Sequence, residues 1–390
     1  MAHGGAVLLS LFIVFVAAQI GAEIAQRLKL PGVVGEIAAG CVVGPSLLGW
    51  VQPAEALDVL AEIGVVLLLF SVGLETRLGE MKRVGRSALQ VGVLGIIFPF
   101  ALGALWAHGS GFDWIKSLFV AAAFVATSAG ITARVLQELG ALRREESRVI
   151  LGAAVIDDIL AMLLLGVVTA LQSGGELRLS HLVVVLAEAV GFVLVIGLVG
   201  PHVMRRSSRW LEAPINPHSP FTLVLALCLG LAFLSTQFSL AAIIGAFLAG
   251  MIASETPQRE TLEHQTQPLL ALMAPFFFVM TGSKVELAQL ASVDTLLTLA
   301  LITAIAVVSK LAGGFLGALS LGRRSATIVG VGMIPRGEVG VVVASLGLGA
   351  GVFSARLYAL IVAMSLLTAM ITPPILALLL RRHPPPLTNE

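Results

Sequence analysis

Long apolar runs recur along the whole chain, and short segments rich in charges, glycine or proline separate them. A helix needs about 20 mostly apolar residues to cross a bilayer. The pattern therefore predicts thirteen membrane-spanning helices. Their approximate ranges are 5–28, 31–49, 54–75, 85–108, 117–138, 147–172, 181–206, 218–236, 239–256, 265–282, 293–319, 324–350 and 354–381.

The composition restricts the class of protein further. Charged residues make up only 12% of the 390 residues and hydrophobic residues 57%, with a mean hydropathy of +0.99. A soluble domain carries about 25% charged residues, so these values exclude a soluble enzyme, a secreted disulfide scaffold and a disordered chain. The net charge of +1 gives no basic surface for nucleic acid. We expect an all-α polytopic membrane protein that is not an enzyme and needs no cofactor.

Lysine and arginine are distributed unequally between the two sides of this topology. Seventeen of the 24 lie on one side, four on the other, and three inside predicted spans. Cytoplasmic loops are enriched in positive residues, so we expect the N-terminus outside and the C-terminus in the cytoplasm, in a bacterial cytoplasmic (inner) membrane. Residues 383–390 are expected to form a short cytoplasmic tail, with no nucleotide-binding or regulatory domain.

Two pairs of segments repeat at a nearly constant offset. Residues 33–44 resemble 243–254, and residues 70–78 resemble 279–287, with offsets of 210 and 209. The paired spans are seven helices apart, and an odd separation means opposite orientations in the membrane. This predicts two inverted six-helix repeats joined by a linker helix. Such repeats, with a binding site at the midplane between them, are typical of secondary transporters.

Two symmetry-related spans contain residues that interrupt helices. The fifth carries VATSAGITARV at 125–135, in which Thr127, Ser128 and Gly130 weaken the helix. The twelfth carries VGMIPRGEVGVVV at 331–343, where Pro335 and Gly337 interrupt it. Unwound backbone survives at membrane depth only where protein buries it or where it lines a cavity. We therefore predict two broken crossing helices whose free carbonyls and half-helix ends face a cation site.

The few charges predicted to lie in the middle of spans are the strongest indication of a transport site. Asp157 and Asp158 are adjacent in the sixth span, within GAAVIDDILAMLLL. Each carboxylate costs about 2.5–3.5 kcal/mol at the bilayer centre on insertion scales. Neighbouring side chains on a helix point about 100° apart, so one carboxylate can face a cavity while the other faces a neighbouring helix. Two such carboxylates titrate as a coupled pair, which a site that exchanges protons for cations requires.

Lys310 lies in the middle of the eleventh span and is the natural partner of one aspartate. Whether it carries a proton or forms a static salt bridge is left open by the sequence. Two more pairs are expected to be structural ion pairs that support the crossing region, namely Arg336 with Glu338 and Arg134 with Glu138. Glu36 and Glu75, at the ends of the second and third spans, are interpreted as interfacial.

These motifs together resemble the cation:proton antiporter 2 (CPA2) family. The resemblance rests on the adjacent aspartates in VIDD, GITARVLQELG before them, the mid-span Lys310 and MIPRGEVG at 333–340, and it covers almost the whole chain. It is closest to NapA-type sodium/proton antiporters and implies an NhaA-like fold and a homodimer. By resemblance, residues 1–84 and 211–288 form a dimerisation domain, 85–175 and 289–382 form a mobile core domain, and 176–210 form the linker helix.

The resemblance also assigns roles to individual residues. Asp158 corresponds to the main sodium ligand and proton carrier, and Asp157 to the partner of Lys310 in proton coupling. Thr127 and Ser128 match the broken-helix positions near the ion. The implied activity is electrogenic sodium/proton exchange by elevator-type alternating access, with Na+ (or Li+ or K+) and H+ as the transported ions.

Alternative functions are separated by specific features. A potassium/proton antiporter of the same fold is the nearest, and nothing in the sequence distinguishes it. An organic-anion/sodium symporter would need polar sodium-site residues such as Asn and Gln in the crossing region and no buried Lys–Asp pair, whereas the one mid-chain asparagine, Asn216, lies in a predicted loop. An intramembrane aspartyl protease would need its two aspartates on different helices.

Overall fold

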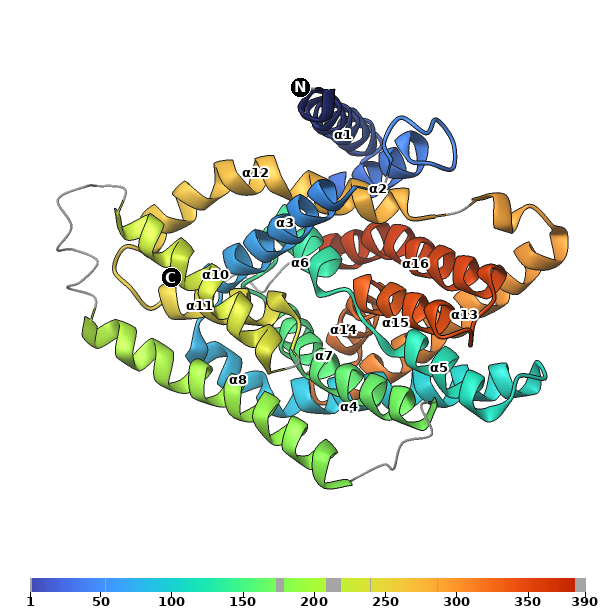
Figure 1. Cartoon of the computed structure of the whole chain (residues 1–390). Helices are drawn as coiled ribbons and strands as arrows, with labels where there is room; N and C mark the ends of the chain where they lie inside the picture. Colours follow the sequence, from blue (N-terminus) through green and yellow to red (C-terminus); the bar gives the residue numbers. More distant parts are fainter. Residues whose placement is uncertain are drawn as a thin grey trace.

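A computed structural model describes residues 2–52, 54–172, 179–207, 219–238, 240–285 and 287–382, and all regular structure in these ranges is helical (Figure 1). The helices of the first half are α1 (Ala2–Arg27), α2 (Gly32–Val43), α3 (Glu55–Leu74), α4 (Leu78–Gly109), α5 (Trp114–Val125), α6 (Ala129–Glu138), α7 (Glu145–Gln172) and α8 (Leu179–Ser207). Those of the second half are α10 (Ser219–Gln237), α11 (Ala242–Ala253), α12 (Arg259–Ser283), α13 (Val293–Gly317), α14 (Arg323–Gly332), α15 (Glu338–Gly349) and α16 (Ala355–Arg382). Short 3-10 turns, η1 (Leu287–Leu290) and η2 (Leu319–Leu321), flank α13.

Within the described residues, ten helical segments are long and apolar enough to cross a membrane. Three shorter apolar helices, α2, α11 and most of α15, accompany them. The helices α2 and α11 have 12 residues each, shorter than the predicted ranges 31–49 and 239–256. The helix α2 ends where Gly44 and Pro45 follow, since proline cannot donate to the preceding turn. The all-helical membrane class is thus confirmed.

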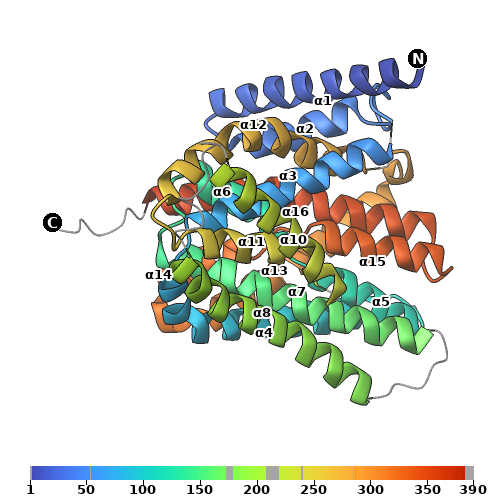
Figure 2. The same ribbon diagram turned by 60° about the vertical axis from the view of Figure 1, so that its left-hand side comes forward.

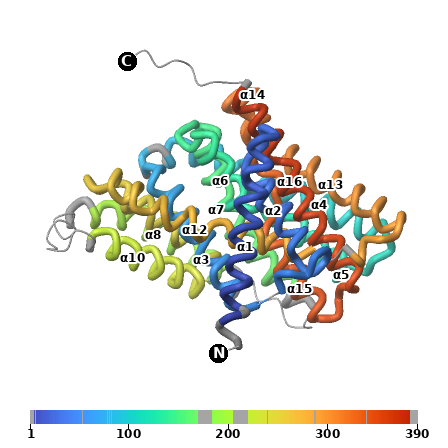
Figure 3. The backbone as a smooth tube through the Cα atoms, turned by 90° about the horizontal axis from the view of Figure 1, so that it is seen from above, coloured from blue at the N-terminus to red at the C-terminus, as the bar shows by residue number. Residues whose placement is uncertain are grey.

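The helices pack in two groups, which lie on opposite sides of the molecule in Figures 1 and 3. In one group, α3 contacts α11 and α12, α2 contacts α1 and α12, and α10 contacts α11. In the other, α4 contacts α5, α7 and α13, while α16 contacts α13, α14 and α15. The long helix α8 lies at the edge of the bundle and contacts α11, α7 and α4 (Figure 2). We call the first group, which contains α1, α2, α3, α10, α11 and α12, the α3/α12 group. We call the second group, which contains α4, α5, α7, α13, α14, α15 and α16, the α4/α13 group.

Close helix contacts in the α3/α12 group depend on glycine and occur in matched pairs. A Cβ atom on Gly40 would lie 2.0 Å from the Val279 carbonyl oxygen, and one on Gly250 would lie 2.2 Å from the Phe70 oxygen. Backbones approach this closely only where a side chain is missing. Glycine at these positions therefore fixes the spacing of α2 from α12 and of α11 from α3.

The same correspondence holds for other close contacts. A Cβ on Gly73 would meet the Phe247 oxygen at 2.3 Å, and one on Gly282 would meet the Ile37 oxygen at 2.1 Å. Gly35 would meet the Gly21 oxygen at 1.9 Å and Gly245 the Leu231 oxygen at 2.0 Å. Gly73 and Gly282 are 209 positions apart, and their contacts Phe247 and Ile37 are 210 apart. Gly35 and Gly245 are 210 positions apart, as are their contacts Gly21 and Leu231. These are the offsets of the sequence repeat.

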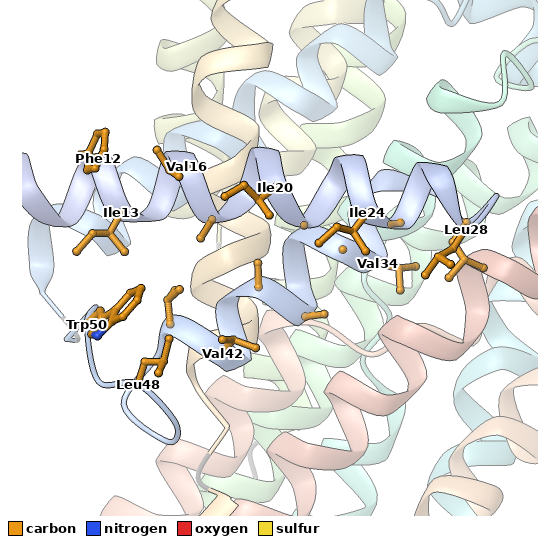
Figure 4. Close-up of a pocket in the computed structure, with 18 residues that line it drawn as sticks. Phe12, Ile13, Val16, Ile20, Ile24, Leu28, Val34, Val42, Leu48 and Trp50 are labelled. Atoms are coloured by element: carbon orange, nitrogen blue, oxygen red, sulfur yellow. The ribbon is translucent and has the colours of Figure 1, made fainter.

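An apolar groove runs along the outer side of the α3/α12 group. It has a volume of about 600 Å³ and lies between α1 and α2. Side chains of α1 from Phe12 to Ala25, with Leu28 directly after the helix, form one wall, and Leu48 and Trp50 lie at one end (Figure 4). Many of these side chains, including Phe12 and Ile20, are exposed. This face is suited to lipid or to another apolar helix, and not to water.

Candidate functional site

Two helix interruptions meet in the centre of the molecule. Residues 126–128 separate α5 from α6, and residues 333–337 separate α14 from α15, as the sequence predicts. The Ser128 N–H donates to the Pro335 carbonyl oxygen at 2.8 Å. A Cβ atom on Gly337 would lie 2.5 Å from the Ser128 Cβ, so this position has room only for glycine. The two breaks therefore cross in direct contact.

Four half-helices point their ends at this crossing. The helices α6 and α15 begin here and direct partial positive charge towards it, while α5 and α14 end here and expose carbonyl oxygens. Thr132 donates to the Gly332 carbonyl at the end of α14, at 2.8 Å. The buried Ser128 caps α6 by accepting from Ile131 N–H at 3.5 Å. The helix ends at the crossing are thus stabilised from within the bundle.

The Arg336 side chain is fully buried and binds backbone carbonyls around the crossing. Its Nη1 donates to Val125 O at 3.2 Å and to Ala126 O at 3.5 Å, and its Nη2 donates to Ala306 O at 2.9 Å. Its backbone N–H donates to Thr368 Oγ1 at 3.1 Å. A guanidinium group suits this role because its donors lie in a fixed plane and can reach several acceptors.

The predicted ion pair of Arg336 with Glu338 stays a prediction. The hydrogen bonds of Arg336 go to helix carbonyls, and the side chain of its predicted partner Glu338 lies outside the described residues. The negative end of α5 is itself a favourable environment for a cation. Charge inside the crossing is therefore balanced in part by helix dipoles, which residue types alone do not reveal.

Lys310 and Asp157 form an ion pair with no solvent exposure. The Lys310 Nζ lies 2.7 Å from Asp157 Oδ1 and also donates to Gly95 O and Val125 O, at 2.8 Å each. The other carboxylate oxygen, Asp157 Oδ2, has no hydrogen-bond partner within the described structure. Lys310 thus connects α13 to α4, α5 and α7, and Asp157 keeps one oxygen available for a proton or an ion.

Asp158 faces a different neighbour from Asp157, as the 100° step between adjacent helix positions predicts. It is 3% exposed and lines a small cavity between α7 and the α3/α12 group. Leu69 of α3 and Ile243, Ile244 and Phe247 of α11 form the far wall. The cavity measures about 10 Å³, roughly the space for a single water molecule. Asp158 therefore sits at the boundary of the two helix groups, behind an apolar barrier.

The other residues predicted near the ion also lie at this boundary. Thr127 is buried in the break, and its Oγ1 has no hydrogen-bond partner among the described residues. Gly130, in the first turn of α6, faces Val65 and Phe277 of the other group, where a Cβ would lie 2.9 Å from Val65 Cγ2. Gly130 thus permits close packing of α6 on α3 and α12.

A larger cavity reaches the crossing from the side of the molecule where α12 ends. It has a volume of about 340 Å³, and its lining includes Thr281 and Lys284 at one end and Arg336 and Gly337 at the other. Lys284 is half exposed and lies 3.5 Å from the Asp58 carboxylate. This cavity therefore borders the crossing at Arg336 and Gly337, and Asp158 is not among its lining residues.

A cluster between α2 and α6 corrects the interpretation of Glu36 as interfacial. Glu36 is 3% exposed, and its Oε2 has no hydrogen-bond partner within the described residues. Arg134 and Glu138 pair at 2.9 Å as predicted, and Glu138 also accepts from Gly32 N–H at 2.9 Å. This pair therefore connects α6 to α2 instead of supporting the crossing. Glu36 is buried because α6 packs over the start of α2, a tertiary contact that the hydropathy pattern does not contain.

Sequence reasoning also missed several polar groups around the site. Thr132, Thr368 and the carbonyl of Gly95 each bind a residue or helix end at the crossing. Thr132 lies within the quoted run VATSAGITARV, so its position was a usable signal. The carbonyl of Gly95 lacks a helical donor because Pro99, four residues on, has no N–H, but only tertiary packing brings this carbonyl to Lys310.

Comparison with known proteins agrees with this geometry. The family described as "Sodium/hydrogen exchanger, transmembrane" matches residues 11–382. The high-affinity Na+/H+ antiporter NhaS3 of Synechocystis sp. is 35% identical, over 94% of this chain and 88% of NhaS3. The Na+/H+-K+ antiporter GerN of Bacillus cereus is 34% identical, over 93% of this chain and 94% of GerN.

A solved structure has the same fold. The sodium proton antiporter MjNhaP1 from Methanocaldococcus jannaschii superposes with a TM-score of 0.68, covering 97% of this chain and 96% of its own, at 17% identity. At that identity the likeness shows the fold alone. The family match over nearly the whole chain carries the assignment: this integral membrane protein belongs to the sodium/hydrogen exchanger family.

Proposed function

We propose that this chain is a secondary active antiporter that exchanges sodium ions for protons across a membrane. The observation that carries the proposal is the site itself, with Asp158 at the boundary of the two helix groups and the buried Asp157–Lys310 pair behind it. A carboxylate in a poorly hydrated site must bind a proton or a cation, because a bare charge is costly there. Competition between the two for one site couples their movements.

We propose specific roles for the site residues. Asp158 binds the sodium ion and carries the proton, and the unpartnered Thr127 Oγ1 and Asp157 Oδ2 supply further oxygen donors. Ser128 fixes the start of α6 near the ion. When no sodium ion is bound, Lys310 neutralises Asp157. Sodium binding at the Lys310–Asp157 pair then changes the net charge of that pair.

The overall architecture that we propose has thirteen spans in two inverted repeats. It is supported by the glycine contacts, in which Gly40 against Val279 corresponds to Gly250 against Phe70 at the repeat offsets. With the N-terminus outside, the exposed Lys284 end of the larger cavity faces outward. The proposed location is the bacterial cytoplasmic membrane.

Transport is proposed to proceed by an elevator-type movement of the α4/α13 group, as the core domain, past the α3/α12 group. Asp158 supports this division, because it belongs to one group and faces the apolar wall of the other. Two inward protons per sodium make the exchange electrogenic. Each proton then contributes ~1.36 kcal/mol per pH unit, and the net charge ~2.3 kcal/mol per 100 mV.

The α3/α12 group is also the proposed contact of a homodimer. The apolar groove between α1 and α2, with exposed Phe12 and Ile20, offers the kind of face that helices pack on inside a bilayer (Figure 4). Native mass spectrometry from nanodiscs measures the assembly directly. A mass of two chains is expected, and a single chain would contradict the dimer.

The transport proposal is tested by flux measurements in proteoliposomes loaded with a pH-sensitive dye. Sodium is expected to drive proton movement in the wild type, and Asp158→Asn is expected to abolish it. Asp294→Asn is the matched control, because Asp294 lies in an exposed ion pair with Arg356 far from the crossing. Wild-type protein that moves no protons in response to sodium or lithium would contradict the proposal.

Potassium/proton exchange is a second candidate, because the name of GerN includes potassium as well as sodium. The same dye assay separates the two functions when each cation is added alone. A response to potassium in the absence of sodium and lithium responses would assign the second function.

A further inference from the structure

A separate charged cavity lies among helix ends, away from the crossing. It has a volume of about 200 Å³ and is lined by Glu75, Arg77, Arg143 and Arg259. Glu75 directly follows α3, and Arg77 directly precedes α4. Arg143 lies between α6 and α7, and Arg259 is the first residue of α12. Neither the proposed transport route nor the crossing uses these side chains.

The three arginines of this cavity are not neutralised by ion pairs. Within the described residues, no carboxylate oxygen lies within 4.0 Å of their guanidinium nitrogens. The Nε and Nη2 atoms of Arg259 are buried and have no hydrogen-bond partner there. Arg259 also stands at the positive end of α12, where a cation is unfavourable. The cavity therefore has an excess of positive charge and buried donors in need of acceptors.

An excess of positive charge excludes this cavity from the path of a cation. Three arginines against the single lining carboxylate of Glu75, even with Glu263 nearby, repel sodium and potassium. The complementary ligand is an anion. Guanidinium groups present planar, paired donors that match the oxygens of a phosphate group. The cavity also exceeds the roughly 30 Å³ that one water occupies in the liquid, so a hydrated phosphate fits.

We propose that this cavity is a binding site for a phosphate group, held by Arg77, Arg143 and Arg259. The phosphate comes either from solution or from the headgroup of an anionic lipid. Arg143 belongs to the α4/α13 group, and Arg259 belongs to the α3/α12 group. A phosphate bound to both connects the two groups, and a ligand stabilises the arrangement that binds it best. Occupancy therefore slows any exchange that moves one group past the other.

The effect on transport rests on the proposed antiport function, whereas binding does not. Glu75 makes the binding depend on pH. Burial and the neighbouring Glu263 raise the pKa of Glu75, against the lowering effects of a hydrogen bond with Gln137 and of Arg143 and Arg259. Protonation of Glu75 removes the only carboxylate charge from the cavity lining. Sulfate, which does not titrate near neutral pH, should therefore bind more tightly as the pH falls.

Binding is measured by isothermal titration calorimetry of the full chain in phosphatidylcholine nanodiscs, with inorganic phosphate, sulfate and chloride as titrants. We expect saturable binding of phosphate and sulfate and none of chloride. Loss of one charge-assisted contact costs roughly tenfold or more in affinity, so Arg259→Gln and Arg143→Gln should each weaken binding by at least that factor. Arg356→Gln is the control, because Arg356 is exposed and pairs with Asp294, and this variant should bind phosphate as the wild type does.

Nanodiscs that contain phosphatidic acid distinguish the two sources of phosphate. If the heat of inorganic phosphate binding is lost in these nanodiscs, the site belongs to the lipid headgroup. If that heat is retained, the site belongs to free phosphate. The thermal midpoint of each variant without ligand shows that it is folded, and Arg77→Gln replaces any variant that is not. Absence of saturable phosphate binding, or equal affinity in the wild type and in both folded variants of the cavity arginines, would overturn the proposal. Because calorimetry needs no transport, a failed flux assay would leave this result unaffected.

Discussion

The buried pair of Lys310 and Asp157 provides the most quantitative prediction. Lys310→Met preserves the length of the side chain and removes its charge and its three hydrogen bonds, to Asp157, Gly95 and Val125. The Asp157 carboxylate and the Gly95 carbonyl then lose this donor, whereas Val125 O keeps its hydrogen bond from Arg336 Nη1. Lys310 and Asp157 have no solvent exposure, so water does not replace the lysine.

The magnitude follows from the geometry. Removing one partner of a fully buried ion pair costs about 3–5 kcal/mol, because the remaining charge stays uncompensated. The unpaired Gly95 carbonyl adds about 1–3 kcal/mol, while protonation of Asp157 limits the total. Asp157→Asn in the same chain removes the orphan charge, so the double variant should recover part of the loss. We expect a coupling energy of about 1–3 kcal/mol between the two positions.

The assay is thermal unfolding in detergent, followed by the fluorescence of the four tryptophans. Wild type, Lys310→Met, Asp157→Asn and the double variant form the cycle. Lys284→Met is the control, because its pair with Asp58 is 3.5 Å long and half exposed, and such pairs contribute about 0–1 kcal/mol. The reasoning is refuted if Lys310→Met is as stable as Lys284→Met, or if the two single effects simply add.

Three further predictions concern other parts of the molecule. Gly40→Ala should destabilise the protein by about 1–3 kcal/mol, since its Cβ would lie 2.0 Å from Val279 O, whereas Gly230→Ala, with nothing within 4 Å, should be neutral; equal melting temperatures would contradict this. Burial and Glu263 raise the pKa of Glu75, so the free-energy cost of keeping its ionised carboxylate in the folded protein grows with pH. Glu75→Gln should therefore raise the melting temperature at about pH 8, and this gain should shrink as the pH falls. Arg336→Lys should lower both stability and sodium-dependent proton flux, because an ammonium group cannot span the Val125, Ala126 and Ala306 carbonyls; unchanged flux and stability would exclude a supporting role.

Much of the site could be anticipated because charge is so costly in a membrane. Asp157, Asp158 and Lys310 are conspicuous in a chain with 12% charged residues, and the only mid-span lysine had few candidate partners. Lys310 lies beside Asp157, and Asp158 faces a different neighbour, as the 100° step between adjacent helix positions requires. The helix breaks were equally visible, since proline and glycine act on the local backbone.

Features that depend on tertiary packing could not be obtained in this way. Glu36 lies near a helix start and was interpreted as interfacial, yet α6 covers it. The hydrogen bonds of Arg336 to carbonyls of α5 and α13 are likewise absent from the sequence pattern, and its predicted pair with Glu338 stays a prediction. Backbone carbonyls are the same in every residue, so a sequence shows a buried cation but not the helix end that solvates it.

The glycine positions lie between these two cases. The sequence repeat paired Gly40 with Gly250 and Gly73 with Gly282 without giving a reason for glycine there. The structure supplies the reason, since each one lies within reach of a backbone oxygen on a neighbouring helix. The pattern predicted equivalent positions, and only the packing identifies them as helix contacts.

Sodium-linked proton release from the purified protein tests the central claim most directly. If one carboxylate at Asp158 binds either a proton or a sodium ion, adding sodium to weakly buffered protein in detergent should release protons. The release should saturate with sodium and diminish as the pH rises and the site loses its proton. Asp158→Asn should abolish it, and Asp294→Asn should not. Equal proton release from wild type and Asp158→Asn, or none from the wild type at any pH where it is folded, would contradict a shared site.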